Sequence, residues 1–389
     1  MENAVDFAAH NAEVAQVWEA YHRRQPIRVP VILGINPRYT MFRHPANPRG
    51  IQFADYLRDP QLMLERQCEH EYWIRHHVPQ DAPMGLPADG WHIHVDFQNT
   101  YEAVWFGCPW ILRDGQVPDA APLLADDTKK NLLFERGIPD PFTGGEMARN
   151  WEFYAYFKRK QEEGFTWKDR PIAAVSPTGL GTDGPMTIAC CLRGATEFCT
   201  DLLADTGYAL QLLEYITEAT IQRIQAYRKH LGMPLKTQSW GFADDSIQLL
   251  STGMYRELIL PFHRRLVETF AESGPNGIHL CGDATRHFPL IREELKVDSF
   301  DTGYPVDFAW LRRTLGPDVQ IQGGPTVMLL QHGSPAAVDA EVRRICESGI
   351  LAGGRFILRD ANNVPPGVPL ENLQALYQAA KQYGRYPAS

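Results

Sequence analysis

The chain of 389 residues lacks a long apolar run, a basic cluster and a signal-peptide pattern. No stretch approaches 18 consecutive apolar residues, which argues against a membrane-spanning helix. Its 47 acidic residues outnumber its 38 basic ones. Without a Lys/Arg-rich arm, nucleic acid and anionic membrane surfaces are disfavoured as partners. The acidic N-terminal stretch has neither the basic nor the apolar region of a signal peptide.

Cysteine is scarce and scattered, with seven residues that lack the spacing of a disulfide framework. This usage is typical of a reducing compartment, and we expect a cytoplasmic protein with free thiols. Neither a GxGxxG nor a Walker motif occurs, which argues against a nucleotide-binding doubly wound sheet.

What is present is a regular alternation of β-rich runs and helical spacing in the second half. We expect strands over 237–245, 277–283, 297–303, 319–325 and 355–363. We expect helices over 252–273, 285–295, 305–315, 335–349 and 369–384. This alternation predicts a parallel sheet with covering helices.

The first half is less regular. We expect helices over 5–24, around 146–163 and through most of 186–231, and strands in 27–36, 91–97 and the start of 171–185. Together these elements predict an α/β fold, a single (β/α)8 barrel over 27–389. A helical extension precedes it over 1–26, and an insertion lies around 113–170.

Active sites of such barrels lie at the carboxyl ends of the strands. Polar side chains gather at the expected ends here: Asn36, Arg38, Asp96, Asp183, Asp244, Asp245, His279, Cys281, Asp283, Asp301, Gln322, Asp360, Asn362 and Asn363. We expect them to share one cavity.

The stretch GIHLCGDATRHF at 277–288 places His279 and Cys281 two residues apart. On a strand both side chains point to the same face. Imidazole nitrogen with thiolate sulfur suits zinc, although two ligands do not complete a site. The alternative is a packed strand end, because His and Cys both occur in protein interiors.

Other candidates also have ordinary structural readings. Of Asp244 and Asp245, one could serve the site while the other caps the following helix. Arg38 could form an ion pair with a barrel carboxylate, and Asn362 suits a turn. His92 and His94 share a strand face, but without a third partner they are more typical of solvent-facing or interface residues.

Several motifs resemble the uroporphyrinogen decarboxylase superfamily. They are FILRDANNVPPGVPLENLQALYQAAKQYG near the end, QGGP at 322–325, DGPMTI at 183–188 and ADDSIQLLSTGMYRELILPFHRRL at 243–266. The resemblance implies a (β/α)8 barrel, in agreement with the pattern of strands and helices. It leaves two branches, the haem-pathway decarboxylases and the zinc methyltransferases that move methyl groups from corrinoid proteins to thiols.

The decarboxylase branch is matched at few of its site positions. The resemblance puts its second N-terminal arginine on Arg38 and its pyrrole-facing aspartate on Asp96. Its first arginine falls on Gly34, and its tyrosine, serine and histidine fall on Cys191, Asp245 and Asn362. A lost arginine and an added carboxylate disfavour a polyanionic substrate.

The methyltransferase branch is matched by the HxC motif at His279 and Cys281. The resemblance places its third ligand on Asn362, which is a poor zinc ligand, so another residue must complete the shell. The acceptable carboxylates are Asp360, Asp301, Asp283 and Asp245.

We therefore predict a zinc-dependent methyltransferase-like enzyme with a corrinoid protein or small methyl donor as partner and, from the resemblance, a homodimer. We assign metal binding to His279, Cys281 and Asp360, catalysis to Arg38, Asp96, Asp244 and Asp245, and substrate contacts to Tyr39, Asp183, Gln322 and Asn362. The alternatives are a metal-free decarboxylase and a barrel that binds a small molecule without turnover.

Overall fold

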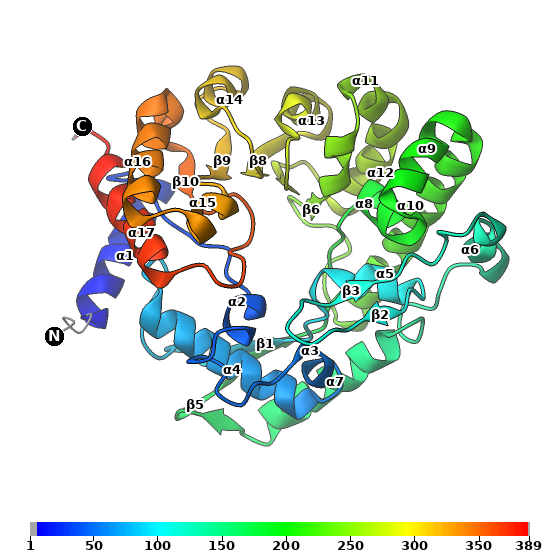
Figure 1. Cartoon of the computed structure of the whole chain (residues 1–389), viewed down its shortest axis with the longest axis horizontal. Helices are drawn as coiled ribbons and strands as arrows, with labels where there is room; N and C mark the ends of the chain where they lie inside the picture. Colours follow the sequence, from blue (N-terminus) through cyan, green and yellow to red (C-terminus); the bar gives the residue numbers. More distant parts are fainter. Residues whose placement is uncertain (1–5, 388–389) are drawn as a thin grey trace.

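The computed structural model describes residues 6–387. Its first helix, α1 (Phe7–His22), starts where the Asp6 carboxylate accepts hydrogen bonds from the backbone of the first turn. Figure 1 shows α1 beside the last helix, α17 (Leu370–Tyr383), so the first and last helices of the described residues lie close together. A backbone bridge between Arg28 and Arg385 joins them. The predicted helix over 5–24 is thus present, with residue 5 outside the described residues.

Five parallel strands form the main sheet, in the order β10-β9-β8-β7-β6. They are β6 (Gly241–Ala243), β7 (Asn276–Leu280), β8 (Val297–Thr302), β9 (Gln320–Gly323) and β10 (Phe356–Leu358). Four of them lie inside runs that the sequence predicts as strands, and β7 begins one residue before its predicted run at 277–283. Ile278 and Leu280 of β7 are buried, and His279 between them is partly exposed on the other face.

Helices follow these strands in turn and cover the outer face of the sheet (Figure 1). They are α11 (Thr252–Met254), a π-helical turn (Tyr255–Ile259), α12 (Leu260–Phe270), α13 (Phe288–Leu295), α14 (Phe308–Leu315), α15 (Val327–His332) and α16 (Pro335–Ile345), which continues into a π-helical turn (Cys346–Ile350). The helices predicted in the second half are therefore confirmed.

A second, smaller sheet holds β1 (Trp91–His94) parallel to β5 (Arg170–Ser176), with β4 (Thr166–Trp167) antiparallel at its edge. Across residues 113–170 lie parts of a hairpin, β2 (Trp110–Ile111) with β3 (Asp119–Ala120), and two helices, α6 (Leu132–Arg136) and α7 (Met147–Glu162). The predicted helix around 146–163 is α7.

The remaining helices build the first half and the far side of the molecule. They are α2 (Pro37–Met41), α3 (Phe53–Tyr56), α4 (Pro60–His77), α5 (Tyr101–Trp105), α8 (Pro185–Arg193), α9 (Ala195–Ala204) and α10 (Thr206–His230). None of the helices in residues 6–387 is both long and apolar enough to cross a lipid bilayer.

The strand predicted in 27–36 forms only two isolated bridges, of Arg28 with Arg385 and of Val31 with Leu358 of β10. Side chains take the place of a neighbouring strand here: Asp81 accepts from the backbone N–H of Val31 at 2.7 Å. On the facing edge of β1, the Gln67 amide bonds both the N–H and the carbonyl of His94. Within the described residues, the hydrogen bonds thus define a mixed α/β fold with one all-parallel sheet of five strands, a smaller mixed sheet and a short antiparallel hairpin.

Candidate metal centre and its cavity

The carboxyl ends of β6, β7 and β8 are side by side because these strands are neighbours in the main sheet. Ala243 pairs with His279, and His279 pairs with Asp301 on the other side. Two residues beyond Ala243, Asp245 opens a 3-10 turn (Asp245–Leu249). The register therefore brings Asp245, His279 and Asp301 to one edge of the sheet.

Asp245, His279 and Cys281 form a group whose potential ligand atoms all lie within 4.8 Å of one another. His279 Nε2 is 3.0 Å from Cys281 Sγ, and Asp245 Oδ1 accepts from the Cys281 backbone N–H at 2.7 Å. Zinc bonds of about 2.0 Å to nitrogen and 2.3 Å to sulfur at a tetrahedral angle separate the two atoms by about 3.5 Å. Side-chain rotation that moves Nε2 and Sγ about 0.5 Å further apart would meet that separation. The donor set therefore fits zinc.

The other ring nitrogen of His279, Nδ1, is hydrogen-bonded to the carboxylate of Asp301. Asp301 Oδ2 accepts from Nδ1 at 2.7 Å and also from Arg359 Nη1 at 2.5 Å. Burial disfavours a charged ring, but the hydrogen bond and the charge of Asp301 outweigh burial and raise the pKa of His279.

The thiol of Cys281 faces a side-chain amide. Its Sγ lies 3.0 Å from Asn362 Oδ1. Burial, and then the nearby Asp245 carboxylate, raise the pKa of this thiol. Without a cation, Cys281 is therefore a thiol at neutral pH, and a bound cation would favour its thiolate.

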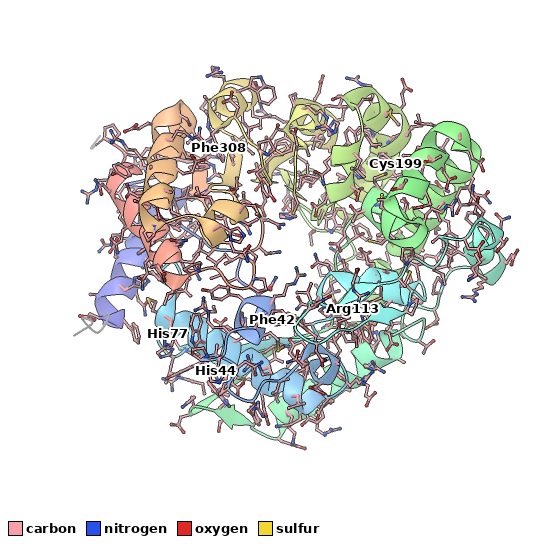
Figure 2. All side chains as sticks on the ribbon, in the orientation of Figure 1. Phe42, His44, His77, Arg113, Cys199 and Phe308 are labelled. Carbon is pink, nitrogen blue, oxygen red and sulfur yellow. The ribbon has the colours of Figure 1, made fainter. Side chains whose placement is uncertain are left out.

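A cavity of about 410 Å³ opens in front of this group. Figure 2 shows side chains from the surrounding elements pointing towards the centre of the molecule. The cavity is lined by Arg38, Asn99, Glu102, Ala103, Asp183, Thr187, Ile188, Cys191, Ala243, Asp245, Gln248, His279, Cys281, Asn362 and Asn363. Arg38 donates to two amide oxygens, Gln98 Oε1 at 2.5 Å and Asn99 Oδ1 at 2.6 Å.

A buried ion pair supports the opposite wall. Arg223 Nη2 lies 2.7 Å from Glu102 Oε1, and Glu102 Oε2 accepts from the backbone N–H of Asp183 at 2.7 Å. Burial, followed by the charges of Glu102 and Asp245, raises the pKa of Asp183 to about 8. Asp183 is therefore mostly a neutral carboxyl at pH 7, able to donate a hydrogen bond.

Asp96 lies beside a second cavity of about 410 Å³, which Arg38 and Asn99 line as well. Its carboxylate is buried and accepts from the Tyr56 hydroxyl at 3.0 Å and from the Gln98 amide at 2.5 Å. The two cavities are thus neighbours, with Arg38 between them.

Besides Asp96, the structure places four predicted site residues outside the cavity of the candidate metal centre. Asp244 is fully buried; it accepts from the backbone of Met186 and Thr187 at the start of α8 and pairs with His263 at 2.8 Å. It is the aspartate that caps a helix, although the helix is α8 rather than the following one.

Tyr39 is also fully buried, and its hydroxyl donates to the Val368 carbonyl at 3.0 Å. Gln322 lies on β9 opposite Asp301 in the sheet register.

Asp360, predicted as the third metal ligand, lies outside the group around His279. Its Oδ1 accepts from the Gly34 backbone N–H at 2.7 Å, and burial raises the pKa of its carboxyl to about 6. Asp245, predicted as catalytic and weighed as a ligand, occupies the position beside His279 and Cys281 instead.

Among the lining residues that were not predicted, four carry a carboxylate, amide or hydroxyl group: Asn99, Glu102, Thr187 and Gln248. Asn99 and Glu102 follow directly on the strand that ends near Asp96, so their proximity to that strand end was a usable signal. Thr187 lies in the DGPMTI motif beside Asp183. Gln248 comes three residues after Asp245 and carries no such signal.

Comparisons with known proteins bear on the family and the fold of the chain. Residues 175–383 match the family model "Uroporphyrinogen decarboxylase (URO-D)", which is more than half of the chain. A methylated-thiol–coenzyme M methyltransferase of Methanosarcina mazei is 35% identical over 139 residues, covering 35% of each chain. A uroporphyrinogen decarboxylase of Pelobacter propionicus is 26% identical over 211 residues, covering 52% of this chain and 58% of that one.

The chain thus covers less than two thirds of the length of these relatives. A solved structure of a methyltransferase from Methanosarcina mazei superposes with a TM-score of 0.63. It covers 95% of this chain and 98% of its own, at 18% identity, which is a likeness of fold.

Proposed function

The chain belongs to the uroporphyrinogen decarboxylase family, and within it we propose a zinc-dependent methyltransferase that moves a methyl group between a corrinoid or other small donor and a thiol or similar acceptor. The observation that carries this proposal is the group of Asp245, His279 and Cys281 at the wall of a cavity. Oxygen, nitrogen and sulfur donors that converge on one point suit zinc. The 35% identity to a methylated-thiol methyltransferase supports the same branch.

These three residues would hold the ion, with the cavity in front of them left for substrate. Zinc bound there supplies Lewis acidity, which favours the thiolate form of a coordinated thiol at neutral pH. Asp301 keeps the ring of His279 in place through Nδ1.

The cavity walls provide the contacts that orient a substrate. Arg38 is held by amide oxygens and can bind an anionic end of the substrate. Asp183, neutral at pH 7, can donate a hydrogen bond or a proton from the opposite wall. We propose that Asp96 helps to position Arg38 through Gln98, whose amide donates to Asp96 and accepts from Arg38.

Decarboxylation of a polycarboxylate is the weaker candidate. Arg38 is the one arginine or lysine among the described residues that line the cavity, which also holds Asp183 and Asp245. A substrate with many carboxylates needs several cations.

The partner, oligomeric state, compartment and fold that we propose are those implied by the resemblance to the methyltransferase branch. We propose a corrinoid protein as the methyl carrier, a homodimer in the cytoplasm, and a fold that is a variant of the (β/α)8 barrel. A barrel that binds a small molecule without turnover stays an alternative that the first experiment separates.

That experiment measures the metal content of protein purified without chelator or affinity metal, beside Cys281→Ser. We expect about one zinc per chain in the wild type and its loss in the variant, because the thiolate is the strongest donor of the group. Cys199→Ser is the matched control, since Cys199 is a partly exposed thiol on α9 outside the cavity (Figure 2).

Zinc that persists in Cys281→Ser would contradict the assigned ligands. No metal in any of the proteins would contradict the methyltransferase proposal and favour metal-free decarboxylation or binding alone.

A further inference from the structure

One carboxylate oxygen of Asp301 accepts hydrogen bonds from two side chains, the proposed metal ligand His279 and the guanidinium of Arg359. Oδ2 accepts from His279 Nδ1 at 2.7 Å and from Arg359 Nη1 at 2.5 Å. We propose that Asp301 is a positioning residue of the metal centre, which holds the ring of His279 with Nε2 towards Cys281. Arg359 in turn holds Asp301. This inference rests on the proposed function.

The sheet register explains why the carboxylate reaches the ring. Asp301 on β8 lies directly opposite His279 on β7, so both side chains project from the same face. A hydrogen bond at Nδ1 fixes the plane of the ring and places the proton on that nitrogen. The lone pair of Nε2 is then directed away from Asp301, to the side where Cys281 Sγ lies at 3.0 Å.

The two carboxylates beside His279 therefore have different roles. Nδ1 and Nε2 flank Cε1 of the imidazole ring and their bonding directions diverge widely, so a carboxylate bonded to Nδ1 is directed away from a metal at Nε2. Asp245 belongs to the group of potential ligand atoms and Asp301 does not. Asp301 was weighed as a ligand from the sequence, and the geometry assigns it to the ligand's support instead.

Because Gly34 has no side chain, it leaves room for the guanidinium of Arg359, which holds Asp301. A Cβ added at Gly34 would overlap Arg359 Nη2, and it would approach the Asn362 carbonyl and Asn363 Oδ1 to 3.0 Å. The guanidinium of Arg359 thus passes over the bare Cα of Gly34. A side chain at position 34 would push Arg359 away from Asp301 without changing any charge.

The experiment measures zinc affinity of the full-length, metal-free protein by competition with a chromophoric chelator. Asp301→Ala should weaken zinc binding about 10–100-fold, the usual effect of losing an outer partner of a metal-bound histidine. Asp301→Asn should lose less, because its amide oxygen still accepts from Nδ1. Gly34→Ala should weaken binding by less than Asp301→Ala.

Asp298→Ala is the matched control: Asp298 lies on the same strand, is exposed, and faces Arg292 at 3.6 Å. Its zinc affinity should equal that of the wild type. If Gly34 acts through Asp301, the double variant Gly34→Ala/Asp301→Ala should bind zinc no more weakly than Asp301→Ala. The absorption spectrum of the Co²⁺-loaded protein should change in Asp301→Ala and stay unchanged in Asp298→Ala.

Thermal unfolding of the metal-free variants separates a positioning role from a structural one. Wild-type zinc affinity in Asp301→Ala, with or without a loss of thermal stability, would overturn the inference. A wild-type protein that binds no zinc would instead remove the proposed function on which the inference rests.

Discussion

Replacing Arg223 by methionine removes the cation that balances a buried carboxylate behind the cavity. The side chain of Arg223 is fully buried and that of Glu102 is 3% exposed, with 2.7 Å between Nη2 and Oε1. The same Nη2 donates to the Gly181 carbonyl at 2.7 Å. Breaking such a pair leaves an uncompensated buried charge, so Arg223→Met should lower the free energy of unfolding by about 3–5 kcal/mol.

Urea unfolding of a double-mutant cycle tests this reasoning. Glu102→Gln alone should also destabilise the protein, because it strands the Arg223 cation. The double variant should cost about 1–3 kcal/mol less than the sum of the two single variants, since it leaves no unpaired buried charge. Gln222→Ala on the exposed face of α10 is the control and should change stability by less than about 0.5 kcal/mol. Strictly additive effects would refute the assigned ion pair.

Two further predictions concern groups beside the cavities. The Asp183 carboxyl, with its pKa raised to about 8, stabilises the fold fully below its unfolded pKa of about 4, and this contribution is lost as the pH rises towards 8. In metal-free protein, Asp183→Asn should therefore flatten the fall in urea stability between pH 5 and pH 8, and an unchanged slope would contradict the shift. Tyr56→Phe removes the hydroxyl that donates to buried Asp96 at 3.0 Å, and thermal unfolding should report a loss of about 1.5–3 kcal/mol.

The strand–helix alternation was readable after residue 237 because most strands there carry both buried and partly exposed residues and are followed by an amphipathic helix, although β10 is buried throughout. The first half broke that rule. Residues 27–36 are apolar and β-rich, yet Asp81 caps the backbone of Val31 where a strand would pair. Periodicity reports burial and does not reveal whether a backbone or a side chain supplies the hydrogen bond.

The helix α4 was not predicted, although its start carries a signal. Asp59 accepts from the backbone N–H of Gln61 and Leu62, and Pro60 stands at the first helical position. Polar residues such as Arg66, Gln67 and His70 are buried on this helix, which blurs its amphipathic pattern. Tertiary contacts, such as Gln67 on the edge of β1, explain that burial and are invisible in the sequence.

For the candidate metal centre, the sequence indicates that His279 and Cys281 lie together, whereas Asp360, predicted as the third ligand, lies outside the group of potential ligand atoms. The HxC spacing puts His279 and Cys281 on one face of any strand. For the third ligand, the resemblance drew attention to the closing segment, which holds Asp360 and Asn362. The rule that consecutive strands are usually neighbours pointed the other way.

That rule places the end of β6 beside β7, and Asp245 follows β6 by two residues. Asp360 follows β10, which β9 and β8 separate from β7 in the sheet order. The segment after β10 nevertheless reaches this group, because Asn362 Oδ1 lies 3.0 Å from Cys281 Sγ. The Asp360 carboxylate itself is bonded to the Gly34 backbone instead. The pairing of Ala243 with His279 sets Asp245 beside the ring. The oxygen donor of the candidate site therefore comes from the neighbouring strand end at Asp245, while Asn362, which the resemblance aligns with the third ligand, contacts the thiol as an amide.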